Sequence, residues 1–378
     1  MINYKSELIQ FLKNSNSTEK SYAQKIISKL KESKYICIFG AGQMGRSLAC
    51  LFRELNIDIK VDFFCDNDKE KWGQVVCNEI TCISPTTLKS YKESVAIIIA
   101  TKYYEEIVEQ LKKEGITNLY PIVTFFYFKN NILYGNNASK IELIQDKLSQ
   151  VMDALADEQS QRVALQLVKN WFAESPAHID YKSICTANQY FDDSVIKLGD
   201  KEIFVDAGAY DGGTILEFLQ KVQNKFTTIY SFELDRKNFS ILEETMVKMD
   251  SALKSKIHIY NIGLWDKRKT IRYNELIQGS NIEDEGEIEG NVDALDNVLC
   301  NSKVTLIKMD IEGAELKALQ GAAQSIKNYK PKMAICVYHN PEDLWEISLY
   351  LKSIVPEYKI YLRHYTTFES ETVCYAVI

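Results

Sequence analysis

The chain has 378 residues, which is long for one hydrophobic core and suits two domains of ordinary size. Its formal charge of −7 comes from 45 basic and 52 acidic residues with no basic stripe, so a nucleic-acid substrate is disfavoured. The nine cysteines are scattered without a CxxC pair, as in a reduced cytosolic protein. Residues 1–30 are charged and amphipathic, and no segment approaches the length of a membrane span. We therefore expect a cytoplasmic protein without a membrane span.

The first 125 residues have the pattern of a small doubly wound unit. Helical spacing over residues 1–30 predicts a helical cap. Strand and helix patterns then alternate, with strands at Tyr35–Phe39, Ile59–Cys65, Val95–Ala100 and Leu119–Val123 and helices at Gln43–Leu55 and Tyr104–Gly115. This alternation predicts a Rossmann-like domain over residues 1–125.

A glycine-rich turn follows the first of these strands. Glycine lets the backbone approach a ligand, and the helix that follows aims its free amide groups at polar ligand atoms. Asp66 lies 21 residues after Gly45, the spacing of an acid that binds a ribose. The residues predicted to bind a ligand here are Gly40, Gly42, Gln43, Met44, Gly45 and Asp66. The pattern allows NAD or a purely structural domain as alternatives, but no hydride-transfer residues are apparent downstream.

The segment after Asp66 carries a resemblance of its own. Asn67–Gly73 and Ile80–Pro85 resemble the nucleotide-sugar-binding N-terminal domain of bacterial sugar acyltransferases. The resemblance implies a nucleotide sugar or related ligand for this domain. For Trp72, a place in the core is favoured over a base-stacking platform.

Residues 126–199 predict a helical connector, because strand signals mostly stop there. Alternation resumes over residues 200–378, with strands that end at Asp206, Glu233, Asn261, Asp310 and His339. The last two apolar runs, Tyr358–Arg363 and Thr372–Ile378, are joined by a short polar loop and predict an antiparallel hairpin. Such an ending is typical of the class I methyltransferase sheet. The fold class expected is therefore α/β, with two doubly wound Rossmann-like domains.

The turn after the strand that ends at Asp206 predicts a cofactor. Its acid–glycine pattern is that expected for S-adenosylmethionine, whose ammonium group Asp206 can serve. Glu233, 25 residues after Gly208, can accept hydrogen bonds from both ribose hydroxyls. Asn261 would lie near the adenine, although a strand-end cap explains it nearly as well. The predicted cofactor residues are Asp206, Gly208, Tyr210, Asp211, Gly212, Glu233, Asn261 and Asp310.

Catalytic candidates follow the later strands. Asp310 ends a strand, Glu312 lies on the turn after it, Lys308 comes two residues earlier and His339 ends the next strand. His339 is the most natural proton acceptor near neutral pH, and Asp310 could orient it, bind the acceptor or contact the donor. No metal is expected, although Asp310, Glu312 and His339 could in principle hold a divalent ion. The acidic run Glu283–Glu289 predicts a solvated loop.

Several motifs in residues 200–378 resemble the FkbM-type methyltransferases. They are Asp206–Gly212, Asn261–Asp266, Lys308–Glu315, Leu319–Gly321, Tyr338–Leu344 and Leu362–Tyr365. The resemblance implies transfer of a methyl group from S-adenosylmethionine to a hydroxyl oxygen, often on a sugar or natural product. We therefore expect an O-methyltransferase for a sugar, nucleotide sugar, glycan or related acceptor. The alternative is an NAD- or nucleotide-sugar-binding oxidoreductase or binding protein with an inactive methyltransferase-like domain. The acceptor and a homo-oligomeric state stay open.

Overall fold

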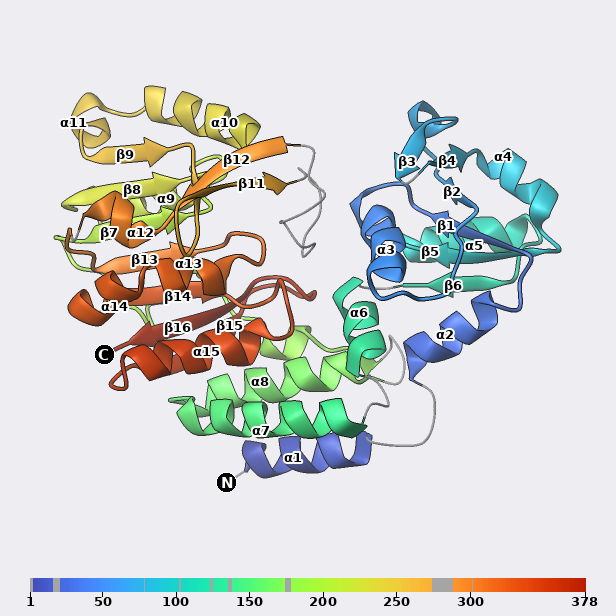
Figure 1. The fold of residues 1–378 in the computed structure, drawn as a ribbon, viewed down its shortest axis with the longest axis horizontal. Coiled ribbons are helices and arrows are strands. Elements are labelled where there is room, and N and C mark those ends of the chain that lie inside the picture. Colours follow the sequence, from blue (N-terminus) through green and yellow to red (C-terminus); the bar gives the residue numbers. More distant parts are fainter. Residues whose placement is uncertain are drawn as a thin grey trace. The chain divides into compact units, whose positions relative to one another are not determined.

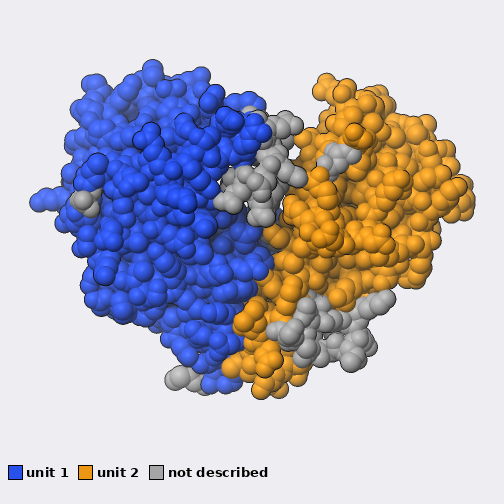
Figure 2. Space-filling view, in the orientation of Figure 1, with its two compact units in different colours: residues 1–6, 146–166, 181–378 blue, residues 7–145, 167–180 orange. Residues whose placement is uncertain are grey.

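The computed structural model describes residues 3–15, 21–77, 79–101, 103–122, 125–134, 138–173, 178–273, 288–300 and 302–378. Most of the acidic run Glu283–Glu289 therefore lies outside the described residues. The chain divides into two compact units, coloured separately in Figure 2. Unit 1 comprises residues 1–6, 146–166 and 181–378, and unit 2 comprises residues 7–145 and 167–180.

Unit 2 is built on a six-stranded sheet of order β3-β4-β2-β1-β5-β6 (Figure 1). Its strands are β1 (Tyr35–Phe39), β2 (Phe63–Cys65), β3 (Val75–Cys77), β4 (Ile80–Ile83), β5 (Val95–Ile99) and β6 (Leu119–Pro121). All pairs are parallel except β3 with β4. Successive β1 residues pack into different cores, with Ile36 and Ile38 in one and Cys37 and Phe39 in the other. A sheet covered on both faces explains why this strand reads as one apolar run.

Helices cover this sheet, and two of them begin with a serine side chain that caps the helix. The helices are α2 (Tyr22–Leu30), α3 (Gln43–Glu54), α4 (Pro85–Leu88), α5 (Tyr104–Lys113) and α6 (Phe125–Tyr134). Helix α2 begins with a capping box, in which the Ser21 side chain accepts from the Gln24 amide and the Gln24 side chain accepts from the Ser21 amide. The amide of Ala23 donates to Asn131 Oδ1 at 2.8 Å, which fixes α2 against α6.

Unit 1 is built on a seven-stranded sheet of order β15-β16-β14-β13-β7-β8-β9. Its strands are β7 (Ile203–Ala207), β8 (Thr228–Phe232), β9 (Ile257–Tyr260), β13 (Leu306–Met309), β14 (Lys332–Cys336), β15 (Lys359–His364) and β16 (Thr372–Val377). The first five of these are parallel, and β16 runs antiparallel to both β14 and β15. The expected closing hairpin and the expected fold class are thus confirmed.

The helices of unit 1 follow the strands as predicted. They are α9 (Gly213–Lys221), α10 (Arg236–Val247), α11 (Ser251–Lys254), α12 (Leu295–Leu299), α13 (Glu315–Gly321), α14 (Ala323–Tyr329) and α15 (Asp343–Ile354). Phe218 of α9 and Leu242 of α10 join one core over the sheet. A small sheet of β10 (Gly263–Leu264), β11 (Lys269–Tyr273) and β12 (Ile288–Asp293) was not predicted from the sequence. No helix in the described ranges has the length and apolar character that a membrane span requires.

Three helices, α1 (Tyr4–Ser15), α7 (Ala138–Ala154) and α8 (Glu158–Trp171), are divided between the two units. The buried guanidinium of Arg363 in β15 binds Asp157 Oδ2 at 2.7 Å and Ser160 Oγ at 3.0 Å, so the start of α8 is fixed to the sheet. Residues 178–199 were predicted as part of a helical connector, but they contain only a short 3-10 turn at Lys182–Ile184. This stretch instead runs as a loop toward the strand ends of unit 1.

Candidate active site

The glycine turn of unit 1 lies against the end of β13. Gly208 has a φ of +77°, and a Cβ atom there would lie 1.8 Å from the carbonyl oxygen of Asp310. Its amide donates to the carbonyl of Phe232 at 2.9 Å. Only a residue without a side chain fits between these two strand ends. The turn therefore brings β7 and Asp310 into backbone contact.

Glu233 follows β8 and holds the same turn. Its Oε2 accepts from the amide of Tyr210 and its Oε1 from the amide of Asp235, both at 2.8 Å. Burial raises the pKa of the carboxyl group, and these two backbone bonds partly oppose that shift. Each oxygen keeps further acceptor capacity for a ligand hydroxyl. The ribose role predicted for Glu233 fits this geometry and stays a prediction.

The other residues of the turn are arranged around Glu233. The side chain of Tyr210 is 59% exposed and its backbone is left-handed, with a φ of +51°. Asp211 Oδ1 accepts from the amide of Gly213, and Gly212 precedes α9 in a left-handed conformation. Asn261 Nδ2 donates to the carbonyl of Glu233 at 2.9 Å, so its side chain caps the strand end. Its predicted contact with adenine is untested.

Asp206 and Lys308 form an ion pair beneath the turn. Lys308 Nζ lies 3.2 Å from Asp206 Oδ1 and donates to the Gly208 carbonyl at 2.7 Å. Both side chains are almost completely buried. Burial lowers the pKa of Lys308, but the charges of Asp206 and Asp310 outweigh it, so the pKa is raised and the ammonium group persists. Lys308, predicted beside the catalytic groups, thus faces Asp206, and the predicted contact of Asp206 with the methionine ammonium is untested.

Asp310 is held by two tyrosines. Tyr190 Oη donates to its Oδ2 at 2.7 Å, and Tyr338 Oη donates to its Oδ1 at 3.1 Å. Burial raises the pKa of Asp310, but the positive charges of Lys308 and His339 and the hydrogen bond from Tyr190 outweigh it, so the pKa is lowered. Asp310 is therefore an anion at neutral pH, with its orientation fixed by neutral donors.

His339 is fully buried among carboxylates. It lies three residues beyond the end of β14, not at the strand end as predicted. Its Nε2 is 3.5 Å from Asp310 Oδ1 and 3.6 Å from Glu312 Oε2, and its Nδ1 is 3.1 Å from Glu315 Oε1. Burial lowers the pKa of His339, but Glu315, Asp310 and Glu312 together raise it to about 10. The ring is then cationic near neutral pH, which differs from the ready proton acceptor expected from an ordinary imidazole.

The structure brings Asp310, Glu312 and His339 together as predicted and adds residues that sequence reasoning did not assign to the site. Tyr190 comes from the stretch expected to be helical. Glu371, in the loop before β16, lies 3.5 Å from Tyr338 Oη and accepts a hydrogen bond from Gln189. No local motif marks Tyr190 or Glu371, because only the tertiary fold carries them to the strand ends.

The glycine turn of unit 2 has a similar frame. Gly40, with a φ of +112°, packs against the carbonyl oxygen of Ala100, whereas a Cβ atom at Gly42 would meet nothing within 4 Å. Asp66 Oδ2 accepts from the amide of Ala41 at 2.8 Å and pairs with Lys71 Nζ at 3.0 Å. The predicted ligand residues of this turn are thus near one another, and their ligand stays a prediction.

The other predicted residues near this turn of unit 2 have clear positions. Gln43 is exposed, Met44 packs against one core, and Gly45 sits tightly against the carbonyl of Gly40. Trp72 packs on the same core and donates from Nε1 to the Asp66 carbonyl at 2.8 Å, as the favoured core role required.

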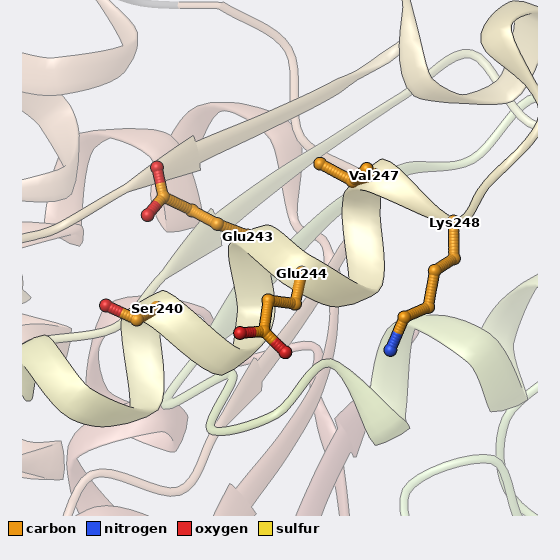
Figure 3. Close-up of a pocket in the computed structure, with 5 residues that line it drawn as sticks. All are labelled: Ser240, Glu243, Glu244, Val247 and Lys248. Atoms are coloured by element: carbon orange, nitrogen blue, oxygen red, sulfur yellow. The ribbon is translucent and has the colours of Figure 1, made fainter.

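A separate concavity lies on the outer face of α10. Figure 3 shows its lining, which is Ser240, Glu243, Glu244, Val247 and Lys248. Four of these residues belong to α10 and Lys248 is its C-cap, and none belongs to the strand-end cluster around Asp310. The concavity is therefore separate from the candidate active site.

Fold and site together define a Rossmann-like methyltransferase class, in which a glycine turn and acidic strand ends share one sheet edge. Residues 206–364 match the family described as methyltransferase FkbM domain, so the chain contains an FkbM methyltransferase domain. Residues 32–122 match the family described as C2185-like, N-terminal. The resemblance of this region to sugar acyltransferases is not confirmed.

One solved structure is similar over almost the whole chain. The crystal structure of methyltransferase FkbM from Methylobacillus flagellatus KT is similar with a TM-score of 0.71 and 20% identity, covering 98% of this chain and 99% of that chain. An rRNA methylase from Streptococcus thermophilus has a TM-score of 0.29 and 12% identity, with coverage of 47% and 87%. A precorrin-6y C5,15-methyltransferase from Geobacter metallireducens GS-15 has a TM-score of 0.32 and 10% identity, with coverage of 52% and 95%. No curated protein matches the sequence.

The family match supports S-adenosylmethionine as the cofactor. The residues present fit such a ligand. Glu233 offers a carboxylate at the tip of β8, and the exposed ring of Tyr210 lies on the turn that Glu233 holds.

Proposed function

We propose that the protein is an S-adenosylmethionine-dependent O-methyltransferase that acts on a hydroxyl of a sugar, nucleotide sugar, glycan or related natural product. The observation that carries the proposal is the position of two acids after the two strands that flank β7. Glu233 follows β8 and Asp310 follows β13, and Gly208 at the end of β7 lies between them. A donor site and an acceptor site can thus share one sheet edge.

The surroundings of Asp310 suit a hydroxyl-rich acceptor. Gln189, Tyr190, Tyr338 and Glu371 form a connected polar network around its carboxylate. An ionised carboxylate with a fixed orientation accepts a hydrogen bond from an alcohol and aligns its oxygen. These groups favour a sugar-like acceptor over an apolar one.

The chemistry needs alignment and removal of one proton. S-adenosylmethionine supplies a methyl group on a positively charged sulfur. The acceptor oxygen would take the methyl carbon as the carbon–sulfur bond breaks, which leaves S-adenosylhomocysteine, and the hydroxyl proton would pass to the carboxylate of Asp310. Asp310 would hold the hydroxyl, the two tyrosines would fix Asp310, and His339 would balance the charge of the carboxylates.

The proposal is tested with purified protein, S-adenosylmethionine and a panel of nucleotide sugars and glycans, with release of S-adenosylhomocysteine as the readout. We expect turnover with at least one acceptor and a loss of about 10²-fold or more in Asp310→Asn. Asp193→Asn is the matched control, because Asp193 is an exposed acid whose one ion pair among the described residues is with Lys221 on the surface. A tightly bound nicotinamide cofactor, or methyl transfer that Asp310→Asn leaves unchanged, would contradict the proposal.

A further inference from the structure

The carboxylate of Glu315 connects two segments of the candidate active site. Glu315 is the first residue of α13, and its side chain is completely buried. Its Oε1 accepts a hydrogen bond from the amide of Ile311 at 2.8 Å, and the same atom lies 3.1 Å from His339 Nδ1. Ile311 directly follows Asp310 in the chain. One buried oxygen atom therefore contacts both the backbone next to Asp310 and the ring that faces the Asp310 side chain.

The turn before Glu315 packs against the segment that carries His339. Gly313 has a φ of +93°, and a Cβ atom there would lie 3.0 Å from Asn340 Nδ2 and 3.7 Å from His339 Cβ. The amide of Asn340 donates to Asp343 Oδ2 at 2.9 Å, which ties the same segment to the start of α15. The backbone around His339 is thus anchored without Glu315. A change of the Glu315 carboxylate should therefore act mainly on the ring.

Exposure separates the groups that an acceptor can touch from those that it cannot. The side chains of Glu315 and His339 are completely buried, whereas those of Asp310 and Glu312 are 22% and 58% exposed. His339 Nε2 faces these two exposed carboxylates at 3.5 and 3.6 Å. A general base must lie within hydrogen-bond reach of the proton that it removes. An acceptor from solvent can reach the carboxylates in this way, and the buried ring lies behind them.

The charges around the ring favour a cation that stays in place. The carboxyl groups that face it are those of Asp310, Glu312, Glu315, Asp343 and Glu371. The buried ammonium group of Lys308 is paired with Asp206. Burial lowers the pKa of His339, but the surrounding acids, Glu315 above all, raise it to about 10. A cationic ring keeps both N–H groups, so Nδ1 can point its proton at Glu315 while Nε2 points its proton at Asp310 and Glu312.

We propose that Glu315 and His339 are positioning residues for methyl transfer: Glu315 fixes the ring of His339, and the ring holds the Asp310 carboxylate in the orientation that receives the acceptor hydroxyl. The catalytic part of this inference rests on the proposed function. The roles are the reverse of one order expected from the sequence, in which Asp310 orients His339 and His339 removes the proton. Without a cation between them, the carboxylates of Asp310 and Glu312 would repel each other and lose this arrangement.

The first test observes the ring directly and needs no acceptor. Histidine is labelled with ¹⁵N in the full-length protein, and the ring signals of its four histidines are followed with pH by NMR. The variants His178→Gln, His258→Gln and His364→Gln assign three signals, and the remaining one belongs to His339. We expect the His339 ring to carry two protons throughout the neutral range and to lose one only near pH 10.

The same measurement is repeated on two variants of glutamate. Glu315→Gln keeps an oxygen that can accept from the Ile311 amide but removes the charge, so the midpoint of His339 should fall by about one pH unit or more. Glu357→Gln is the matched control, because Glu357 is an exposed glutamate that pairs with Lys330 on the surface. It should leave the midpoint unchanged.

Kinetics with an acceptor from the panel test the positioning role. We expect Glu315→Gln and His339→Gln to lower kcat about 10-fold or more, while the KM for S-adenosylmethionine stays within about 2-fold. His258→Gln, at an exposed histidine of β9, should keep wild-type kcat. In Glu315→Gln, kcat should also fall as pH rises through the lowered midpoint of His339, because the cation is then lost. A merely structural role gives no such pH dependence. Circular dichroism and S-adenosylmethionine binding show whether each variant is folded.

The outcomes separate this inference from the proposed function. A His339 ring that is neutral near pH 7 in the wild type, or a midpoint that Glu315→Gln leaves unchanged, overturns the inference and leaves the methyltransferase proposal intact. A wild-type kcat that rises as His339 loses its proton would make the ring the base and also overturns it. A folded protein that methylates no acceptor of the panel removes the proposed function and the catalytic role with it. The NMR midpoint still decides in that case whether Glu315 holds His339 as a cation.

Discussion

Units 1 and 2 have the same backbone arrangement at the strand ends, a glycine turn held by an acid, but they carry different side chains around it. In both, the first glycine of the turn has a positive φ and packs on the carbonyl that follows a neighbouring strand: Gly208 on Asp310, and Gly40 on Ala100. In both, an acid after the second strand accepts a turn amide, Tyr210 to Glu233 and Ala41 to Asp66. This backbone arrangement alone therefore does not determine the function of a unit.

The differences lie at matched positions. Asp206 pairs with Lys308 across β7 and β13, whereas the equivalent residues of unit 2 are Ile38 and Ile98 across β1 and β5. Asp310 likewise stands where unit 2 has Ala100. Unit 2 thus has the same glycine turn without the paired acid and lysine that unit 1 carries.

We expect the largest effect on stability at Gly208, and a much smaller one at Gly42. Gly208→Val would drive a side chain into the Asp310 carbonyl from a left-handed backbone, so we expect a loss of more than about 4 kcal/mol and failure of unit 1 to fold. Gly42→Val meets open space and should cost about 1 kcal/mol or less. Thermal unfolding of both variants measures the difference. Equal melting temperatures for Gly208→Val and Gly42→Val would contradict this prediction.

Next in size is the buried ion pair. Burial raises the pKa of Asp206, and Lys308 opposes that shift. Lys308→Ile would leave this fully buried acid without its cation, at a cost of about 3–5 kcal/mol. The double variant Asp206→Ile with Lys308→Ile gives unit 1 the apolar pair that unit 2 has, and it should recover most of the stability. Urea unfolding of the three proteins measures this. A double variant no more stable than Lys308→Ile would show that the pair does more than balance charge.

Glu233 and Asp66, which hold the two glycine turns, provide a test of which unit binds S-adenosylmethionine. Glu233→Ala removes a charge-assisted acceptor from the unit 1 turn, so S-adenosylmethionine should bind about 1.5–3 kcal/mol more weakly. Asp66→Ala should leave that affinity unchanged, because Asp66 holds the other turn. Glu357→Ala, at an exposed surface acid, controls for net charge. Calorimetry that found the loss in Asp66→Ala instead would reverse the assignment.

A further prediction concerns acid stability. Burial lowers the pKa of His364 to about 4, and its Nδ1 lies 2.8 Å from Thr372 Oγ1 in unit 1. A neutral buried histidine stabilises the fold fully above its unfolded pKa of about 6.5, and this contribution is lost as pH falls toward 4. The free energy of unfolding of wild type should thus fall more steeply between pH 6.5 and 4 than that of His364→Gln. Parallel slopes would exclude His364 as the cause.

Local patterns predicted the frame better than the site. The continuous apolar runs at β1, β5, β7, β8 and β13 were predicted because parallel strands are buried on both faces. The three-residue strands β2 and β3 are too short to give such a signal. The strand predicted at Ile59–Cys65 is therefore longer than β2, and β3 was not predicted. Strand ends likewise located Asp310 and Glu233.

What the sequence could not show was tertiary environment. Tyr190 and Glu371 reach Asp310 from segments about 120 and 60 residues away in the chain, without any periodic signal. The protonation of His339 depends on three carboxylates that gather only in the fold, so the ordinary pKa of histidine misled the prediction of its role. Residue type predicted which groups matter, and packing determined their charge.

The anchoring of α8 on β15 has a consequence for solubility. β15 is the outermost strand of the seven-stranded sheet, and such an edge invites pairing with another chain. Its outer side is already engaged, because the amide of Ala156 donates to the Ile360 carbonyl and the amide of Thr186 donates to the His364 carbonyl, both at 2.8 Å. The Arg363–Asp157 ion pair keeps the segment around Ala156 in that position. The segments around Ala156 and Thr186 thus cover the edge strand β15 and oppose edge-to-edge aggregation, a role independent of any ligand.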